Sequence, residues 1–410
     1  METYTDSALE PVAGGVLAPS GFLASGVAAG LKKGGKLDVA LVAASRSVPA
    51  AAVFTTSSMA AAPVVVSRQN LAAGVARAVV INAGNANACT GERGMTDARA
   101  MVAATASALS CEPHEIVVAS TGVIGVQLPL AVVEAGIAEA AAGLSGGASA
   151  ASDAAAAIMT TDTSAKEAAV AVTVGERTYR VGGMAKGSGM IMPNMATMLG
   201  FITTDAPLTT EACRSMLSSA AGVTFNRITV DGDTSTNDMV LLMASGEAGG
   251  SEIGPHSPEY AAILGAVTHV CRELSHMIVR DGEGATHFVT VTVRGALSDA
   301  DADAAARSIA NSPLFKTAIF GADANWGRVA MAVGKSAATV DPDRLEIEFA
   351  GITTCRDGMA VPFSEDEAAA ALALPEVDVV VDLHLGSAEA TVWTCDLSYE
   401  YVRINGEYRS

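Results

Sequence analysis

The feature that most constrains this chain is the segment 186–199, in which Ala196 directly precedes Thr197 near the middle of the sequence. Two glycines and a proline in this segment are able to hold unusual backbone geometry, and strained backbone is found at functional sites. Attack by the Thr197 hydroxyl on the Ala196 carbonyl would cut the chain. The cut would leave Thr197 with a free α-amine, whose ordinary pKa of about 7.7–8.0 suits a base acting on its own hydroxyl. The segment therefore predicts a self-cleavage step and a threonine nucleophile.

An ordinary structural role explains the same segment. Residues 187–204 form an uncharged run of 18 residues that is rich in Met, Ile and Leu. A buried loop leading into a helix would have this composition, and the run is marginally long enough for a membrane span. Pro193, Asn194 and three glycines argue against a span. The buried loop-to-helix interpretation stays open at this point.

Composition narrows the class of protein. The chain has 410 residues, 50% of them hydrophobic, which is enough for a large core and two or three domains or subdomains. Lysine and arginine number 25 against 44 acidic residues, and the net charge of −19 argues against binding to nucleic acid or anionic membranes. Six scattered cysteines without a C-x-x-C pair, and no signal peptide at the N-terminus, predict reduced thiols in a cytoplasmic protein. Six dispersed histidines indicate no metal site.

Hydrophobic patterning predicts the secondary structure. We expect buried strands at 38–43, 77–82, 288–294 and 345–350. We expect helices at 95–109, 130–142, 209–221 and 258–280. We also expect a surface loop at 143–152, a hairpin from 168–174 and 178–181, and an antiparallel meander at 377–385, 389–395 and 399–404. The mixture predicts an α/β or α+β layered fold, in which helices cover sheets.

A Thr-Gly turn is predicted at Thr121 and Gly122, directly after the apolar run 116–119. Backbone N–H groups at such a turn, with a hydroxyl beside them, would stabilise the oxyanion of an acyl-transfer intermediate. A plain turn at the end of a strand explains the same residues. The asparagine-rich segment 82–91 is interpreted as the scaffold of a tight loop, although it could also support the oxyanion site. Its glycines do not match a dinucleotide-binding fingerprint.

Three further polar features are candidates for substrate contacts. Residues 160–163 offer three hydroxyls and a carboxylate just before the predicted hairpin, and residues 280–286 end a predicted helix with alternating charge and glycine. Lys186 lies eleven residues before Thr197, and in an acidic chain it is a natural partner for a substrate carboxylate. Each feature taken alone is also explained as a capped helix end or a solvated loop.

Taken together, these residues resemble the ornithine acetyltransferase family, the bifunctional glutamate N-acetyltransferases of arginine biosynthesis. Residues 183–199 are similar to the self-cleavage motif of that family. Other similar segments occur in the family order and span most of the chain: 120–122, 159–163, 226–238, 280–284, 321–328 and 401–405.

The resemblance implies a self-processing, layered α/β (α+β) sandwich, similar in arrangement to N-terminal nucleophile hydrolases but with the topology of the ornithine acetyltransferase family. It implies cleavage between Ala196 and Thr197, which gives an α chain of residues 1–196 and a β chain of residues 197–410. Two α and two β chains would assemble.

The resemblance also assigns roles to residues. Thr197 would be the nucleophile for cleavage and for acetyl transfer, and Thr121 and Gly122 would form the oxyanion hole. The residues expected to contact substrate are Lys186, Thr197, Glu283, Asn405, Ser410 and one threonine of the pair Thr160 and Thr161, with Thr161 favoured. Family members usually end in threonine, whereas this chain ends in Ser410, which keeps the hydroxyl and the carboxylate.

The implied reaction moves an acetyl group from N2-acetyl-L-ornithine to L-glutamate through an acetyl-threonine ester, in a ping-pong scheme that needs no cofactor. Some relatives also accept acetyl-CoA as donor, and the sequence leaves that open. One alternative is a self-processed amidohydrolase or aminopeptidase that uses the same nucleophile with water as acceptor. A second alternative is a small-molecule binding protein that has kept the fold without catalysis.

Overall fold

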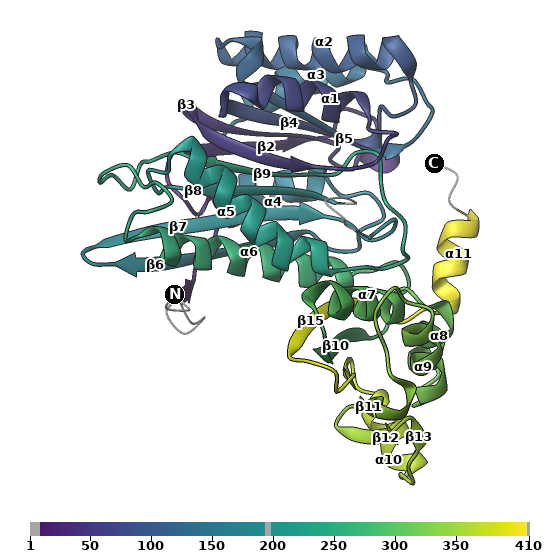
Figure 1. Cartoon of the computed structure of the whole chain (residues 1–410). Helices are drawn as coiled ribbons and strands as arrows, with labels where there is room; N and C mark the ends of the chain where they lie inside the picture. Colours follow the sequence, from purple (N-terminus) through teal and green to yellow (C-terminus); the bar gives the residue numbers. More distant parts are fainter. Residues whose placement is uncertain (1–8, 193–197, 408–410) are drawn as a thin grey trace.

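The structure of this chain is a computed structural model that describes residues 9–192 and 198–407. Its larger part is a sandwich of two β layers between two helical layers (Figure 1). The strands of this part are β1 (Leu9–Pro11), β2 (Phe22–Val27), β3 (Val39–Phe54), β4 (Val75–Asn85), β5 (Ile116–Val123), β6 (Lys166–Val174), β7 (Arg177–Lys186), β8 (Leu199–Thr204) and β9 (Met239–Ala244). The helices are α1 (Ala62–Asn70), α2 (Gly91–Leu109), α3 (Leu130–Ala142), α4 (Ala148–Ala157), α5 (Thr210–Val223) and α6 (Tyr260–Arg280).

The long strand β3 joins the two β layers. Its first part pairs with β2 and β4, and its last part, from Ala50, pairs antiparallel with β9. Strands β4 and β5 are parallel, as are β8 and β9, whereas β6, β7 and β8 run antiparallel. Successive side chains of β3 point to opposite faces of its layer, and both faces are buried. Leu41 faces the core under α1, α2 and α3, whereas Val42 faces the core that contains α4.

The outer helices are held by apolar stripes. In α6 the buried residues recur every three or four positions and include Val267, Cys271, Leu274 and Ile278. This stripe and that of α5 cover β6–β9 on the side away from α4. The six residues of β8 are all buried, because Leu199 and Phe201 face one core and Ile202 faces the other.

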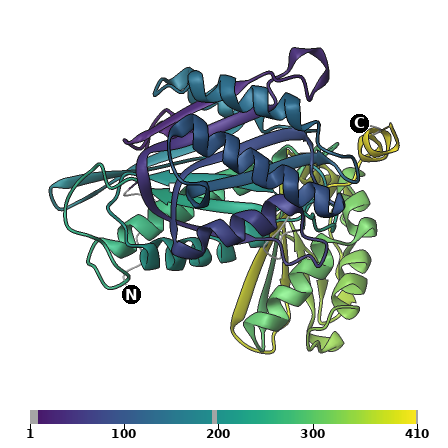
Figure 2. The same cartoon turned by 90° about the horizontal axis from the view of Figure 1, so that it is seen from above.

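A smaller unit follows α6 and lies beside the sandwich (Figure 2). Its sheet has the order β13-β12-β11-β14-β10-β15. The bounds are β10 (Phe288–Ala296), β11 (Glu346–Phe349), β12 (Ile352–Arg356), β13 (Met359–Ala360), β14 (Glu376–Asp382) and β15 (Ala388–Cys395). Its helices are α7 (Asp299–Ala310), α8 (Pro313–Phe320), α9 (Trp326–Gly334) and α10 (Glu365–Leu372), and α11 (Tyr399–Glu407) ends the described chain.

The layered α/β prediction is confirmed, and so are the four predicted helices, the four predicted strands and the hairpin of β6 and β7. The run 187–204 contains a strand, so the loop-to-helix interpretation is wrong. In the part of the chain that the structure describes, no helix is long and apolar enough to cross a membrane.

Three further sequence predictions are wrong. The surface loop 143–152 contains the start of α4, because alanines of this helix, among them Ala151 and Ala154, fill the space between the two β layers. The runs 377–385 and 389–395 of the predicted meander do form strands β14 and β15, but the two strands do not pair with each other, because β10 lies between them. Residues 399–404 form a helix, in which Arg403 pairs with Glu400 and Glu407 at helical spacing.

The packing of α6 gives a test of the core. Leu274 is fully buried in the stripe of α6, whereas Leu297 is 57% exposed. We expect Leu274→Ala to lower the free energy of unfolding by about 2–5 kcal/mol, because the lost methyl groups leave a cavity. The matched change Leu297→Ala should cost less than about 0.5 kcal/mol. Thermal unfolding of the two variants measures the difference, and equal melting temperatures would contradict this core assignment.

Candidate active site

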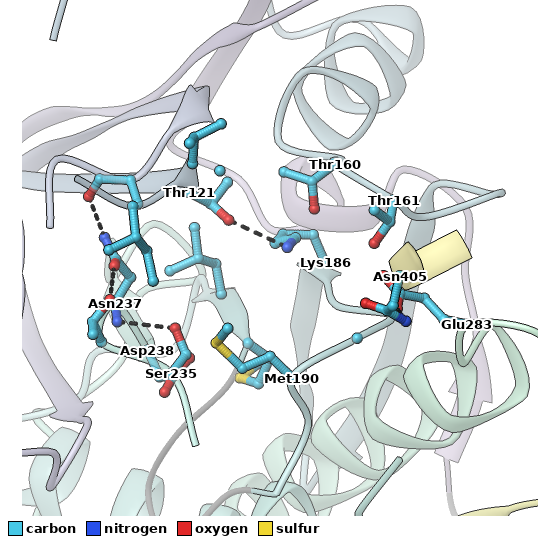
Figure 3. A pocket seen from close by; sticks show the side chains of 18 residues that line it. Thr121, Thr160, Thr161, Lys186, Met190, Ser235, Asn237, Asp238, Glu283 and Asn405 are labelled. Carbon is cyan, nitrogen blue, oxygen red and sulfur yellow. Dashed lines mark hydrogen bonds between the residues drawn. The ribbon is translucent and has the colours of Figure 1, made fainter. Parts of the chain in front are cut away.

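The candidate site is a pocket of about 540 Å³ between the two β layers and the start of the smaller unit. Figure 3 shows polar side chains from several separate segments around it. Of the sequence-predicted residues, those that line this pocket are Thr121, Gly122, Thr160, Thr161, Lys186, Glu283 and Asn405. Ala196, Thr197 and Ser410 lie outside the described residues. Met190 and Met198, which flank positions 193–197, both line the pocket.

The end of β5 is held in one conformation. Gly122 has φ +132°, and a Cβ at this position would lie 2.3 Å from the carbonyl carbon of Gly84, so only glycine fits. The Ser120 hydroxyl donates a hydrogen bond of 2.6 Å to Asn82 Oδ1. Asn82 therefore acts as a scaffold residue for this turn, in agreement with the interpretation of the asparagine-rich segment.

A second asparagine fixes the same turn from the other side of the pocket. Asn237 Nδ2 donates to the carbonyl oxygens of Ala86 at 2.6 Å and Ser120 at 2.9 Å. Because the Ser120 carbonyl belongs to the peptide that ends at the Thr121 nitrogen, Asn237 sets the orientation of that peptide. Asn237 was not assigned a role from the sequence, because nothing local to it identifies partners 117 and 151 residues away.

Lys186 ends β7 and points toward Thr121 (Figure 3), and its Nζ lies 3.3 Å from the Thr121 hydroxyl. Burial lowers the pKa of the Lys186 ammonium, and the neighbouring carboxylate of Asp162 partly offsets this effect. The site therefore contains an almost buried amine next to the hydroxyl that was predicted to serve the oxyanion.

Behind the pocket, a buried ion cluster joins three loops. Lys166, at the start of β6, lies 2.7 Å from an oxygen of Asp162 and 2.5 Å from an oxygen of Asp281. Asp162 also accepts hydrogen bonds from the backbone N–H groups of Thr160 and Gly187. Burial alone would raise the pKa of the Asp162 carboxyl, but the ammonium groups of Lys186 and Lys166 hold it well below its ordinary value.

This ion cluster was not predicted from the sequence. The spacing of Asp162 and Lys166 would suit an exposed pair within one turn of a helix, whereas here it spans the entry into a strand. The third member, Asp281, is 115 residues away along the chain. Only the tertiary fold brings it to Lys166.

At the far end of the pocket, Glu283 contacts the last helix. Asn405, on α11, donates a hydrogen bond of 2.7 Å to Glu283 Oε2. The Glu283 backbone N–H donates to the carbonyl of Ser188, and a Cβ on Gly189 would lie 2.4 Å from the Glu283 carboxyl carbon. Gly189 therefore leaves the space that the Glu283 side chain occupies.

The described chain before position 193 is held in an unusual conformation. Met190 has φ +58°, in the left-handed region that non-glycine residues rarely adopt. Its backbone N–H and that of Ile191 donate to the two carboxylate oxygens of Asp231, at 2.6 and 2.8 Å. Tyr401 Oη donates to the same carboxylate, which links α11 to this segment.

The pocket combines the amine of Lys186, several hydroxyls, the amides of Asn237 and Asn405 and the carboxylates of Asp238 and Glu283, which suits a small substrate that carries both signs of charge. Within residues 9–192 and 198–407, no group of His, Cys, Asp or Glu side chains is arranged to hold a metal ion.

Comparison with known proteins finds close relatives. A model of the ArgJ family matches residues 23–410. The chain is 53% identical to the arginine biosynthesis bifunctional protein ArgJ of Symbiobacterium thermophilum, over 98% of this chain and all of that protein. It is 48% identical to the protein of the same name from Geobacter sulfurreducens, over 95% of this chain and 99% of that protein.

Solved structures are similar over about half of the chain. The arginine biosynthesis bifunctional protein argJ from Bacillus halodurans is 46% identical with a TM-score of 0.50, and covers 52% of this chain and 100% of that one. The ornithine acetyltransferase of Mycobacterium tuberculosis, solved with ornithine, is 41% identical with a TM-score of 0.42, and covers 46% of this chain and 99% of that one.

The lowered pKa of Asp162 predicts a pH-dependent stability. A carboxyl whose pKa is lower in the folded state stabilises the fold above its unfolded pKa, about 3.9, and this stabilisation is lost as pH falls toward the folded pKa. We expect Asp162→Asn to lower the free energy of unfolding at pH 7 by about 3 kcal/mol, because Lys166 and Lys186 lose a buried partner.

The difference between wild type and Asp162→Asn should narrow as the pH falls from about 5 to about 3. Calorimetric melting temperatures of both proteins across this range measure it. A difference that stays constant or widens on acidification would show that the carboxylate of Asp162 does not stabilise the folded state.

Proposed function

The chain belongs to the ArgJ family, and from that premise we propose that its pocket moves an acetyl group from N2-acetyl-L-ornithine to L-glutamate in arginine biosynthesis. The observation that best supports this proposal is that residues far apart in the sequence line the same pocket. Side chains from four regions far apart in the sequence, represented by Thr121, Lys186, Glu283 and Asn405, meet in one pocket that is flanked by both described ends of the segment 193–197.

The proposed reaction is a double displacement at Thr197. Its hydroxyl attacks the acetyl carbonyl of N2-acetyl-L-ornithine, its own α-amine accepts the proton, and ornithine leaves with a proton on its amine. Thr121 and the backbone N–H of Gly122 stabilise the oxyanion of each tetrahedral intermediate. The amine of L-glutamate then attacks the acetyl ester, and N-acetyl-L-glutamate leaves.

Substrate binding follows from the charges of the pocket. The Lys186 ammonium pairs with a substrate carboxylate, which both amino acids carry. Glu283, held by Asn405, receives the positively charged end of ornithine. Thr161, with Thr160 beside it, and Ser410 complete the proposed substrate contacts.

Self-cleavage between Ala196 and Thr197 is proposed as the maturation step. The Thr197 hydroxyl attacks the Ala196 carbonyl, the peptide bond is replaced by an ester, and water hydrolyses this ester to give the α chain of residues 1–196 and the β chain of residues 197–410. The left-handed conformation of Met190, held by Asp231, supports it, because such sparsely populated backbone is concentrated at functional sites and here it lies in the same segment as the proposed cut. The solved argJ chain of Bacillus halodurans supports it too, because its full length covers 52% of this chain, about the share that residues 197–410 occupy.

The proposed mature enzyme contains two α and two β chains and works in the cytoplasm. Extensive burial between the two halves supports their association after the cut, because β8 and β9, which follow position 197, pair with β7 and β3, which precede it.

The first test of this function is the cut itself. Purified wild-type protein should run as two fragments in denaturing electrophoresis, and Thr197→Ala should remain one full-length, inactive chain. Thr178→Ala, which removes an exposed hydroxyl from the hairpin, should be cut like wild type. An active wild-type protein that runs as one uncut band, or a cut Thr197→Ala, would refute the proposed maturation.

The second test is partial exchange. With N2-acetyl-L-ornithine and labelled ornithine but no glutamate, a ping-pong enzyme should move label into acetylornithine, because the first half-reaction is reversible on its own. Thr121→Ala should slow this exchange on the order of 100-fold through loss of oxyanion stabilisation. Release of free acetate without exchange would instead indicate a hydrolase that uses water as acceptor.

A further inference from the structure

Lys166 lies outside the pocket, yet it touches the supports of two of the pocket's walls. Its side chain is 1% exposed, and those of its partners Asp162 and Asp281 are 0% and 8% exposed. An ammonium buried to this degree between two carboxylates is costly to desolvate and is retained only where its contacts are well formed. The groups that hydrogen-bond to these two carboxylates indicate the role of the ion cluster.

The first carboxylate supports one wall. Asp162 accepts from the Thr160 N–H at 2.9 Å and from the Gly187 N–H at 2.7 Å. These contacts fix the loop that carries Thr160 and Thr161, and they fix the backbone directly after Lys186. The threonine wall and the amine of the pocket are therefore both held by one oxygen pair that Lys166 neutralises.

The second carboxylate supports the part of the pocket wall that carries Glu283. The side chain of Asp281 accepts from the Thr163 N–H at 3.0 Å, and its carbonyl accepts from the Ser188 hydroxyl at 2.6 Å. Two residues later, the Glu283 N–H donates to the Ser188 carbonyl at 3.1 Å. The position of the Glu283 carboxylate is therefore coupled through Asp281 to Lys166.

We propose that Lys166 is a positioning residue for acetyl transfer: its ammonium holds the threonine wall and the Glu283 wall at the separation that the substrate requires, without touching the substrate. This inference rests on the proposed function. Lys166 precedes the proposed cut and Asp281 follows it, so the same contact joins the α chain to the β chain at the pocket.

Lys166 also acts on the pocket through its charge. The charged groups that act on Lys186 are Asp162, Lys166, Asp238, Glu283 and Lys32. The charge of Lys166 lowers the pKa of Lys186, so removing it raises that pKa. If protonated Lys186 binds the substrate carboxylate, the high-pH limb of kcat/KM then moves to higher pH. Loss of rigidity alone would not cause this shift.

The test compares Lys166→Met with Lys166→Arg and with Lys316→Met in the cut enzyme. Lys316 is a matched control, because it is a buried lysine that hydrogen-bonds Thr394 in the smaller unit and does not line the pocket. KM and kcat are measured for N2-acetyl-L-ornithine and L-glutamate, with kcat/KM as a function of pH. Thermal unfolding and electrophoresis of each variant report folding and cutting.

We expect Lys166→Met to raise KM for both substrates about tenfold or more, to change kcat less, and to move the high-pH limb upward, since small misplacements of binding groups are costly. Lys166→Arg should have KM values close to those of wild type and the pH profile of wild type. Lys316→Met should lower the melting temperature while leaving KM unchanged.

If wild type shows no acetyl transfer, the proposed function fails, and this inference fails with it. If wild type transfers acetyl groups but KM and the pH profile of Lys166→Met match it, the positioning role alone is overturned. An equal rise of KM in Lys316→Met would also overturn it. If Lys166→Met does not fold, the Asp281→Asn variant is measured instead, because it keeps the contact of Lys166 with Asp162. An unchanged KM in Asp281→Asn would refute the proposal.

Discussion

The arrangement of the pocket depends on the contact of one buried ammonium with two carboxylates. Lys166 and Asp162 lie four residues apart, whereas Asp281 lies 115 residues beyond Lys166, and their contacts place two loops that border the pocket. A buried ion of this kind stabilises the fold only when it is fully paired, and removal of one partner leaves an uncompensated charge. The cluster therefore specifies a single geometry, which is what a site that must orient two different substrates in turn requires.

Tight backbone geometry gives the site its second constraint. Gly122 and Gly189 are both at positions where a Cβ would collide with neighbouring atoms, and Met190 is held in the left-handed region by Asp231. Asn82 and Asn237 fix the turn at Ser120 from two sides. The proposed oxyanion site is thus held by neutral amides, and the described backbone that leads toward the proposed cut is held by one carboxylate.

The positions of many helices and strands follow from local sequence patterns, but the contacts between residues distant in the sequence do not. The apolar residues of α6 recur at a helical period and those of β4 form a short continuous run, so the positions of both elements were predictable from the sequence. The helix α11 was mistaken for a strand because its aromatic and β-branched residues alternate, whereas i,i+3 and i,i+4 charge pairs favour the helix. Resemblance to a family identified the pocket residues. Lys166 was missed because no local motif marks it and its partner Asp281 is distant in the sequence. Asn237 lies in the family-like segment 226–238, but its role was missed because its partners are distant in the sequence.

The central claim is that Thr197 carries the acetyl group, and mass spectrometry of the enzyme tests it most directly. The protein is mixed with N2-acetyl-L-ornithine without glutamate, quenched in acid and digested. We expect a peptide that begins at Thr197 and carries one acetyl group, and this acetyl group should disappear when glutamate is added before the quench. An unmodified Thr197 peptide under conditions where acetyl transfer proceeds, or an acetyl group on another residue that glutamate removes, would contradict it.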